Sequence, residues 1–397
     1  MSHGIDLTAL LEGCAQNSFE DGIRIDSRLE PLSGPGGMVK PAVYEGGTYQ
    51  HDRRWASPQD DEPTQVIVID NVPSQANRLE DALRRNRESI SMPEFVLDLA
   101  ELPHLPAHLP RSLSSLQFPH RNADAYLRDA QLNGQDFLKT KIGEAIFAAT
   151  AQTCGPLIAW FPQALLYGFW QSHLGKKRQN TKHARAWVSE IVGWQPASTE
   201  TRVLGLKGDA LNLNTDDTVT TDPDDRTTWE VGKGTKVAGT RNDKLSEIGH
   251  GQVPFMGKDA PAAAISFARV TQRATVSFAQ LRRVSLGDSS PDADAAVRAL
   301  LVALGMHAHQ LAFAKGFALR SGAELRPLST SVTWLGADGD EPIDIGGADT
   351  TRALLESARE HAASKGVPLD GWGAPATRLT PKENLSAAIR STWPDLD

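Results

Sequence analysis

Thr64–Asp70 reads TQVIVID and is followed directly by Asn71–Leu83, NVPSQANRLEDAL. The first stretch is a short, continuous apolar run, which is typical of a central strand covered on both faces. The second predicts an amphipathic helix that begins near Ser74, a residue type favoured at helix N-caps. Leu79 and Leu83 would lie on its buried side.

The sequence on either side predicts further strands and a second long helix. Gly22–Leu29 alternates apolar and polar residues, so Arg24, Asp26 and Arg28 share one face of a strand. Two strand-like stretches, AISFARV and ATVSFAQLRRV, follow residue 264.

A long helix follows these strands, with Ser290 as its cap and Pro291 in its first turn, and it closes at Ser321–Gly322. Leu325–Leu335 then predicts a last strand. The order strand, helix, strands, helix, strand, with long insertions, predicts an α+β sandwich of the split βαβ kind.

We interpret residues 1–397 as one elaborated domain with three additions. Residues 85–135 predict a helical or irregular insertion. Residues 205–262 predict a thumb or flexible insertion, because a loop of that length in a compact domain is usually functional or disordered. Residues 350–397 predict two amphipathic C-terminal helices.

Composition narrows the possible functions. A chain with 40% hydrophobic and 23% charged residues is typical of a folded globular protein. The net charge of −8 argues mildly against nucleic-acid binding, but binding depends on how Lys and Arg cluster. Cys14 and Cys154 have no disulfide or metal-ligand spacing. With neither a signal peptide nor a membrane span in the pattern, we expect a cytoplasmic protein without cofactor or metal.

Two basic stretches contain no acidic residue. Gln171–Ala186 predicts a phosphate cradle entering a helix at Thr181–Val192, although a solvated surface loop is the alternative. Its charged or titratable residues are His173, Lys176, Lys177, Arg178, Lys182, His183 and Arg185. In Ala260–Gly287, Arg269 and Arg273 lie on strand-like sequence, where a sheet face could follow an RNA backbone. Arginines that discourage edge aggregation are an equal possibility.

Enzyme signatures are largely missing from the sequence. Gly168 and Gly175 are too far apart for a P-loop, and there is no GxSxG motif. His307 and His309 are two residues apart on a predicted helix, so they suit a shared metal ion poorly. We therefore expect a protein that is not an enzyme.

Six segments, spread in order over most of the chain, carry a resemblance to a known family. They are RIDSRLEPLSGPGGMVKPAVYEGGTY (Arg24–Tyr49), VIDNVPSQANRLEDAL (Val68–Leu83), YGFWQS (Tyr167–Ser172), VSEIVGW (Val188–Trp194), LSEIGHGQVP (Leu245–Pro254) and AHQLAFAKGFALRSGAELRP (Ala308–Pro327). Together they resemble the RAMP-superfamily backbone subunit (Cas-seven type) of the type I-G CRISPR Cascade complex, formerly called I-U.

The resemblance implies a ferredoxin-like or RRM-like palm with long finger and thumb insertions. It implies a non-catalytic subunit whose copies coat the guide RNA (crRNA) head to tail. The guide bases would stay free to pair with a target DNA strand. The implied partners are a large subunit, a fused subunit that caps and processes the guide, and a helicase-nuclease.

The predicted RNA contacts centre on the helix after TQVIVID, whose N-terminus would present free N–H groups to the sugar–phosphate backbone. Simple helix capping is the alternative. Leu245–Met256 is the candidate thumb, although an ordinary flexible hairpin would fit as well. The full set of predicted RNA-binding residues is Arg24, Arg28, Lys40, Ser74, Gln75, Asn77, Arg78, His173, Lys176, Lys177, Arg178, Lys182, Arg185, His250, Arg269 and Arg273.

Two other functions stay open at this point. One is a RAMP-type endoribonuclease that cuts the guide precursor with His51, His173, His183 or His250 as general base. The other is a monomeric binder of single-stranded RNA that joins no complex.

Overall fold

The computed structural model describes residues 3–102, 105–172, 181–197, 211, 213, 218–222, 227–231, 241–250 and 264–392. The chain divides into two compact units. The first unit comprises Met1–Ala42, Gln50–Pro196 and Ser266–Asp397, and the second comprises Val43–Tyr49 and Ala197–Ile265. With 35% helix and 31% strand, the structure confirms the predicted α+β class.

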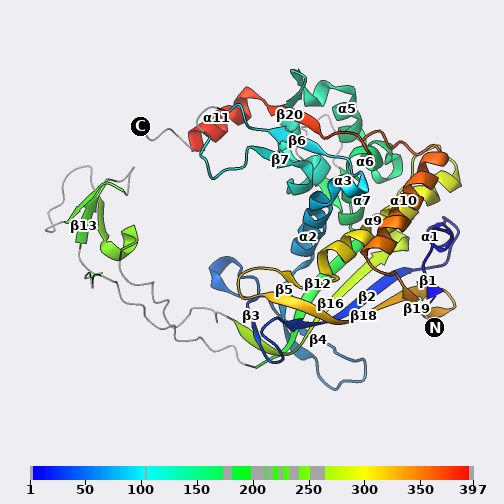
Figure 1. Ribbon diagram of the computed structural model, residues 1–397, viewed down its shortest axis with the longest axis horizontal. Helices are drawn as coiled ribbons and strands as arrows, with labels where there is room; N and C mark the ends of the chain where they lie inside the picture. The colour runs from blue at the N-terminus through cyan, green and yellow to red at the C-terminus, as the bar shows by residue number, and fades with distance from the viewer. Residues whose placement is uncertain are drawn as a thin grey trace. The chain divides into compact units, whose positions relative to one another are not determined.

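A curled, mainly antiparallel sheet of ten strands forms the base of the first unit (Figure 1). Its main path is β1 (His3–Gly4), β19 (Gly339–Asp344), β18 (Glu324–Gly336), β2 (Gly22–Pro31), β16 (Ile265–Ser277), β12 (Trp187–Pro196), β5 (Thr64–Asp70) and β4 (His51–Arg54). Two short strands complete it, β3 (Met38–Val39) beside β16 and β17 (Phe317–Ala318) beside β18.

Helices cover one face of this sheet and leave the other face open (Figure 1). They are α1 (Leu7–Gly13), α2 (Val72–Arg85), α9 (Pro291–Phe313) and α10 (Ala348–Ser364). Ser290 caps α9 by accepting a hydrogen bond from the Ala293 N–H, and Pro291 occupies its first turn. By length and composition α9 could cross a membrane, but 83% of its apolar window is buried inside the fold, as expected for a core helix.

A second, five-stranded sheet lies beyond α2, on the side of the helices away from the main sheet (Figure 1). It contains β7 (Ser112–Ser114), β6 (Phe95–Asp98), β20 (Thr377–Pro381), β8 (Ala130–Leu132) and β9 (Gln135–Asp136). The helices near it are α3 (Arg87–Ile90), α4 (Ala125–Arg128), α5 (Lys141–Ala148), α6 (Gly155–Trp160), α7 (Pro162–Tyr167) and α11 (Glu383–Thr392). Residues 85–135 therefore include strands that pair with the C-terminal β20.

The helix predicted at Thr181–Val192 was wrong. Thr181–His183 forms β11, which pairs with β10 (Phe169–Gln171), and Trp187–Pro196 forms β12. In β12, apolar side chains alternate with polar ones and pack against the helices, so burial favours a strand over a short surface helix. The two strands predicted after residue 264 are one continuous strand, β16, followed by α8 (Phe278–Leu281).

Two predicted helix boundaries also differ. The cap of α2 is Asn71, whose side chain accepts a hydrogen bond from the Ser74 N–H, so Ser74 lies in the first turn. The long helix α9 ends at Phe313 instead of Ser321–Gly322, because the chain then turns to form β17 alongside β18.

The described part of the second unit contains a three-stranded antiparallel sheet in the order β14 (Trp229–Val231), β13 (Thr218–Thr221), β15 (Arg241–Lys244). A 3₁₀ turn at Leu245–Ile248 follows β15, and another lies at Glu45–Gly47.

Candidate nucleic-acid interface

Asp70, the last residue of β5, organises the start of α2. Its carboxylate is fully buried. It accepts hydrogen bonds from Arg78 Nε at 2.8 Å, Arg320 Nη2 at 2.9 Å, Ser74 Oγ at 2.8 Å and Gln75 Nε2 at 2.6 Å. Burial alone would raise the pKa of Asp70, but Arg78, Gln75 and Ser74 together hold it below its ordinary value. Asp70 is therefore ionised at neutral pH.

The same network reaches the N-terminal loop. Arg320, in the turn before β18, donates from Nη1 to the main-chain oxygens of Lys40 (3.1 Å) and Ile69 (3.0 Å). Arg78 also donates to the Leu319 oxygen at 3.1 Å. Three segments far apart in the sequence, at Lys40, at Asp70 and at Arg320, are thus joined by partly buried, charge-assisted hydrogen bonds.

A hollow of ≈ 690 Å³ lies beside this network, and we call it the α2 hollow. Ser74, Asn77, Arg78 and Arg85 of α2 line one side, and Lys315 of the turn after α9 lines the other. Arg85 pairs with Asp81 at 2.6 Å. Among the described residues, Lys315 has no carboxylate within ion-pair distance. The lining therefore combines cations and hydrogen-bond donors with the Asp81 carboxylate and with apolar side chains such as Leu311 and Phe317.

Gln75, which was also predicted to contact RNA, lies elsewhere. Its side chain is fully buried, and its Oε1 accepts hydrogen bonds from Ser189 Oγ and Gln272 Nε2, each at 2.8 Å. It joins α2 to the sheet. The free N–H groups predicted at this helix terminus are also mostly used, because Asn71 holds the Ser74 N–H and Pro73 has none. Anion binding here would depend on side chains.

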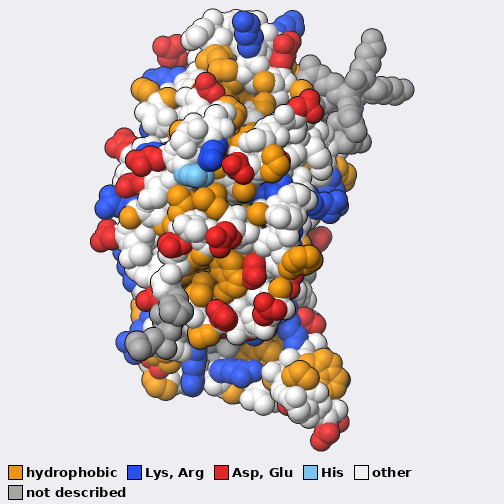
Figure 2. Space-filling model, turned by 90° about the vertical axis from the view of Figure 1, so that its right-hand side faces the viewer, with side chains coloured by type: hydrophobic (Ala, Val, Ile, Leu, Met, Phe, Trp, Pro, Cys, Tyr) orange, Lys and Arg blue, Asp and Glu red, His pale blue; other side chains and the backbone are white. Residues whose placement is uncertain are grey.

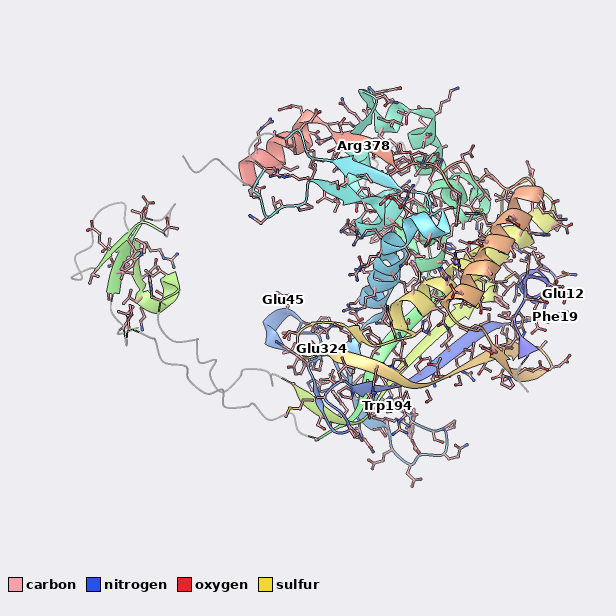
Figure 3. The ribbon with its side chains drawn as sticks, in the orientation of Figure 1. Glu12, Phe19, Glu45, Trp194, Glu324 and Arg378 are labelled. Carbon is pink, nitrogen blue, oxygen red and sulfur yellow. The ribbon has the colours of Figure 1, made fainter. Side chains whose placement is uncertain are left out.

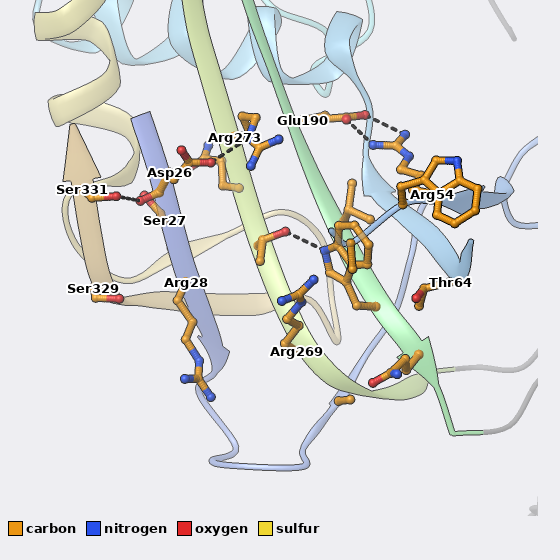
Figure 4. A pocket seen from close by; sticks show the side chains of 18 of the residues that line it. Asp26, Ser27, Arg28, Arg54, Thr64, Glu190, Arg269, Arg273, Ser329 and Ser331 are labelled. Carbon is orange, nitrogen blue, oxygen red and sulfur yellow. Dashed lines mark hydrogen bonds and ion pairs between the residues drawn. The ribbon is translucent and has the colours of Figure 1, made fainter. Parts of the chain in front are cut away.

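The open sheet face, which we define as the face of the main sheet opposite α2 and α9, is polar. Figure 4 shows Asp26 and Arg28 of β2, Glu190 of β12, and Arg269 and Arg273 of β16 projecting into one hollow of ≈ 820 Å³. Trp194, near the end of β12 and labelled in Figure 3, also lines this hollow. The structure thus separates predicted residues by sheet face, with Arg24, Arg28, Arg269 and Arg273 on the open face and Ser74, Asn77 and Arg78 on the helix side.

Charge is mixed on other parts of the surface. On the face that includes α1 and α10, acidic and basic side chains are interspersed around apolar areas (Figure 2). The negative net charge is therefore compatible with local basic surfaces elsewhere.

A comparison with known families matches residues 23–197 to a family described as CRISPR-associated protein GSU0053. This part of the chain, less than half of its length, is similar to CRISPR-associated proteins of that family. The similarity points to a role in CRISPR defence, which is argued below. No curated protein matches the chain. The matched residues include nearly all of β2 and the whole of β5, α2 and α3–α7, whereas Arg269, Lys315 and Arg320 lie outside them.

The remaining predicted RNA-binding residues are dispersed. Lys182 on β11 lines a small hollow with Arg283, and Arg185 lies near the buried Glu80. His250, in the second unit, packs its ring against Trp229 with 5.3 Å between centroids. His173, Lys176, Lys177 and Arg178 lie outside the described residues. Their RNA contacts stay predictions.

Among the described residues, the histidines proposed as general bases and the groups that could bind a metal ion have the following surroundings. The His183 ring is buried with Nε2 2.9 Å from the Leu165 oxygen, and burial lowers its pKa. His51 is exposed on β4. Within the described ranges, no group of three His, Cys, Asp or Glu side chains could hold a metal ion. Burial raises the pKa of both Cys14 and Cys154 to about 12, so neither thiol is a ready nucleophile.

Sequence reasoning missed Lys315, Arg320, Trp194 and Trp55. The sequence itself contained a signal for two of these residues. Lys315 and Arg320 lie within the quoted segment AHQLAFAKGFALRSGAELRP, and both follow the end of the long helix. Trp194 would have been recognised as a neighbour of Arg269 only if β12 had been predicted as a strand.

Proposed function

We propose that this chain is a CRISPR-associated protein, namely a non-catalytic backbone subunit that binds the guide RNA in a type I-G Cascade complex. Copies would assemble head to tail along the guide and hold its sugar–phosphate backbone. The α2 hollow carries the proposal, because Asn77, Arg78, Arg85 and Lys315 meet there beside the loop that contains Lys40. Cations and amides of this kind hold phosphates and sugars without reading bases.

The order of elements supports an RRM-like palm. Along the chain, β2, α2, β12, β16, α9 and β18 follow the order β-α-β-β-α-β. In the sheet, their strands run β18-β2-β16-β12, with the first and third strands of the series in the middle. This arrangement is expected of a ferredoxin-like core, to which β5 and the remaining strands would be additions.

The α2 hollow offers positioning groups and no reaction centre, which supports a binding role over the endoribonuclease alternative. A head-to-tail assembly needs two different surfaces on each copy, and such an interface propagates until another subunit ends it. The proposed partners at those ends are the large subunit and the fused capping subunit, with the helicase-nuclease recruited after target pairing.

Co-expression with a CRISPR array tests the proposal. We expect a large particle that protects RNA of uniform spacer-plus-repeat length. The variant Asn77→Glu/Lys315→Glu should lose most of the co-purified guide, because it places two carboxylates in the α2 hollow. Lys141→Glu is the matched control, since Lys141 is exposed on α5 and lines neither hollow.

The charge-reversed variant Lys176→Glu/Lys177→Glu/Arg178→Glu should also lose guide. The readouts are the length of the protected RNA on a denaturing gel and the particle mass by light scattering. A nucleic-acid-free monomer at both low and physiological salt would overturn the proposal. Cleaved repeat RNA released by the isolated chain would favour the endoribonuclease instead.

A further inference from the structure

We propose that the open sheet face binds a single strand of nucleic acid, separately from the α2 hollow. The inference does not depend on guide binding, because the two surfaces lie on opposite faces of the sheet. Gln75 of α2 bonds to Ser189 and Gln272, which point to the helix side. Arg269 and Arg273 alternate with Gln272 along β16 and therefore point away from it.

In one row of side chains on the open face, every charged side chain is already part of an ion pair. Ser331, Asp26, Arg273 and Glu190 face one another across β18, β2, β16 and β12. Asp26 accepts from Arg273 Nε at 2.6 Å and from Arg24 Nε at 3.0 Å. Glu190 is held by both terminal nitrogens of Arg54. These carboxylates are already paired, so they oppose an incoming anion less than free carboxylates would.

The next positions along the same strands are cationic. Arg28 lies opposite Thr271 on one side and Ser329 on the other. Arg269 lies opposite Trp194 and diagonal to Arg28, which puts the two residues roughly 7–8 Å apart. Both arginines are exposed, and among the described residues neither has a carboxylate within ion-pair distance. Figure 4 shows Arg28 extending into the hollow with no drawn contact.

Arg269 is held in place without using its hydrogen-bond donors. Its guanidinium carbon lies 4.4 Å from the centroid of the Trp194 ring, and the Trp194 Nε1 donates to Thr271 Oγ1 at 2.8 Å. A stacked guanidinium keeps its N–H groups for an outside acceptor. The stacked Arg269 and the exposed Arg28, on adjacent strands and with Ser329 opposite Arg28, suit successive phosphates of one strand.

An exposed indole in the same hollow favours nucleic acid over an acidic peptide. Trp55 is 57% exposed and lines the hollow with Arg28 and Arg269. A free indole face next to phosphate-binding arginines suits a nucleobase, which stacks whatever its sequence. An acidic peptide would satisfy the arginines but would leave the ring uncovered. The partner is therefore a single-stranded RNA or DNA held through backbone and stacking.

The test uses the full chain, both guide-free and loaded with guide by co-expression. Fluorescein-labelled oligo(dT) and oligo(U) that cannot pair with the guide report binding by anisotropy over a salt series. Arg28→Ala/Arg269→Ala should weaken binding at least about tenfold at low salt. It should also lower the slope of log K against log salt by about 1.4, since each phosphate contact with a single strand contributes about 0.7.

The control variant Arg352→Ala/Arg378→Ala removes one exposed arginine from α10 and one from β20. Arg378 lies in the second, five-stranded sheet (Figure 3). This variant should bind the oligonucleotides like the wild type.

Trp55→Ala should weaken binding about tenfold with an unchanged salt slope, because stacking releases no counterions. Thermal melts of each variant confirm that it is folded.

The outcomes separate this site from the guide site. Arg28→Ala/Arg269→Ala should still retain guide, whereas Asn77→Glu/Lys315→Glu should lose guide and still bind oligo(dT). Oligonucleotide affinity and salt slope equal to those of the control variant would overturn the inference. It would also be overturned if the arginine variant changed only the mass of the assembly, which would assign the face to a protein partner.

Discussion

Arg121→Met is expected to destabilise the protein by about 3–5 kcal/mol, because it leaves a buried carboxylate without its counter-ion. Arg121 Nε and Nη2 each donate to Glu80 at 2.7 Å, and both side chains are almost completely buried. Arg121 Nη1 also donates to the Gly168 oxygen at 3.1 Å, and the guanidinium lies 5.6 Å from the Tyr167 ring centroid. The pair joins α2 to the start of β10. Urea unfolding of the purified chain measures the loss.

The stability of the Arg121→Met variant should fall as the pH rises. Burial raises the pKa of Glu80, and Arg121 opposes that rise. Without Arg121, folding must protonate Glu80, so the variant should lose stability as the pH rises above the unfolded value of about 4.3. The difference from the wild type should therefore be smaller at pH 5 than at pH 7.

Glu80→Met/Arg121→Met is the matched control, because a buried pair replaced by apolar residues often costs little. We expect the double variant to recover much of the stability lost by Arg121→Met. Equal unfolding midpoints for wild type and Arg121→Met would contradict this account of the pair.

Asp70→Ala is expected to have the second-largest effect, with about 3 kcal/mol of stability lost and guide retention reduced together. Asp70 is the shared acceptor of Arg78, Arg320, Ser74 and Gln75. Its removal leaves two half-buried guanidinium groups without that carboxylate and releases the Lys40 loop from the start of α2. The side chains that line the α2 hollow, Ser74 and Arg78 among them, would then no longer be held in position. Unfolding midpoints and co-purified RNA measure the two effects.

Asp70→Asn separates charge from shape in the same network. The pKa of Asp70 is held below its ordinary value, so its contribution is complete above the unfolded pKa of about 3.9 and is lost as the pH falls through the lower folded value. The stability difference between wild type and Asp70→Asn should be constant from pH 7 to pH 5 and should shrink below about pH 3.9. A difference that stays unchanged in acid would show that the carboxylate charge is not what holds the arginines.

Local pattern in the sequence predicted much of the framework. The apolar run TQVIVID is β5, the alternating Gly22–Leu29 is part of β2, and the Ser290 cap begins α9. Each of these depends on neighbours within a few residues, which is why period and capping predict them. The prediction of a helix at Thr181–Val192 failed because the charged first half of this segment resembles a surface helix. The burial that makes Trp187–Pro196 a strand comes from the distant helices α2 and α9.

The sequence by itself determined the α+β class, the basic composition of Gln171–Ala186 and Ala260–Gly287, and the resemblance to CRISPR proteins. Only the tertiary structure decided which charges meet. It joined Lys40, Asp70 and Arg320, and it placed Arg28 beside Arg269 on the opposite side of the sheet from Arg78. Strand register and sheet face depend on hydrogen bonds between segments hundreds of residues apart. A local pattern carries no information about those partners, because the same alternation is compatible with many neighbours.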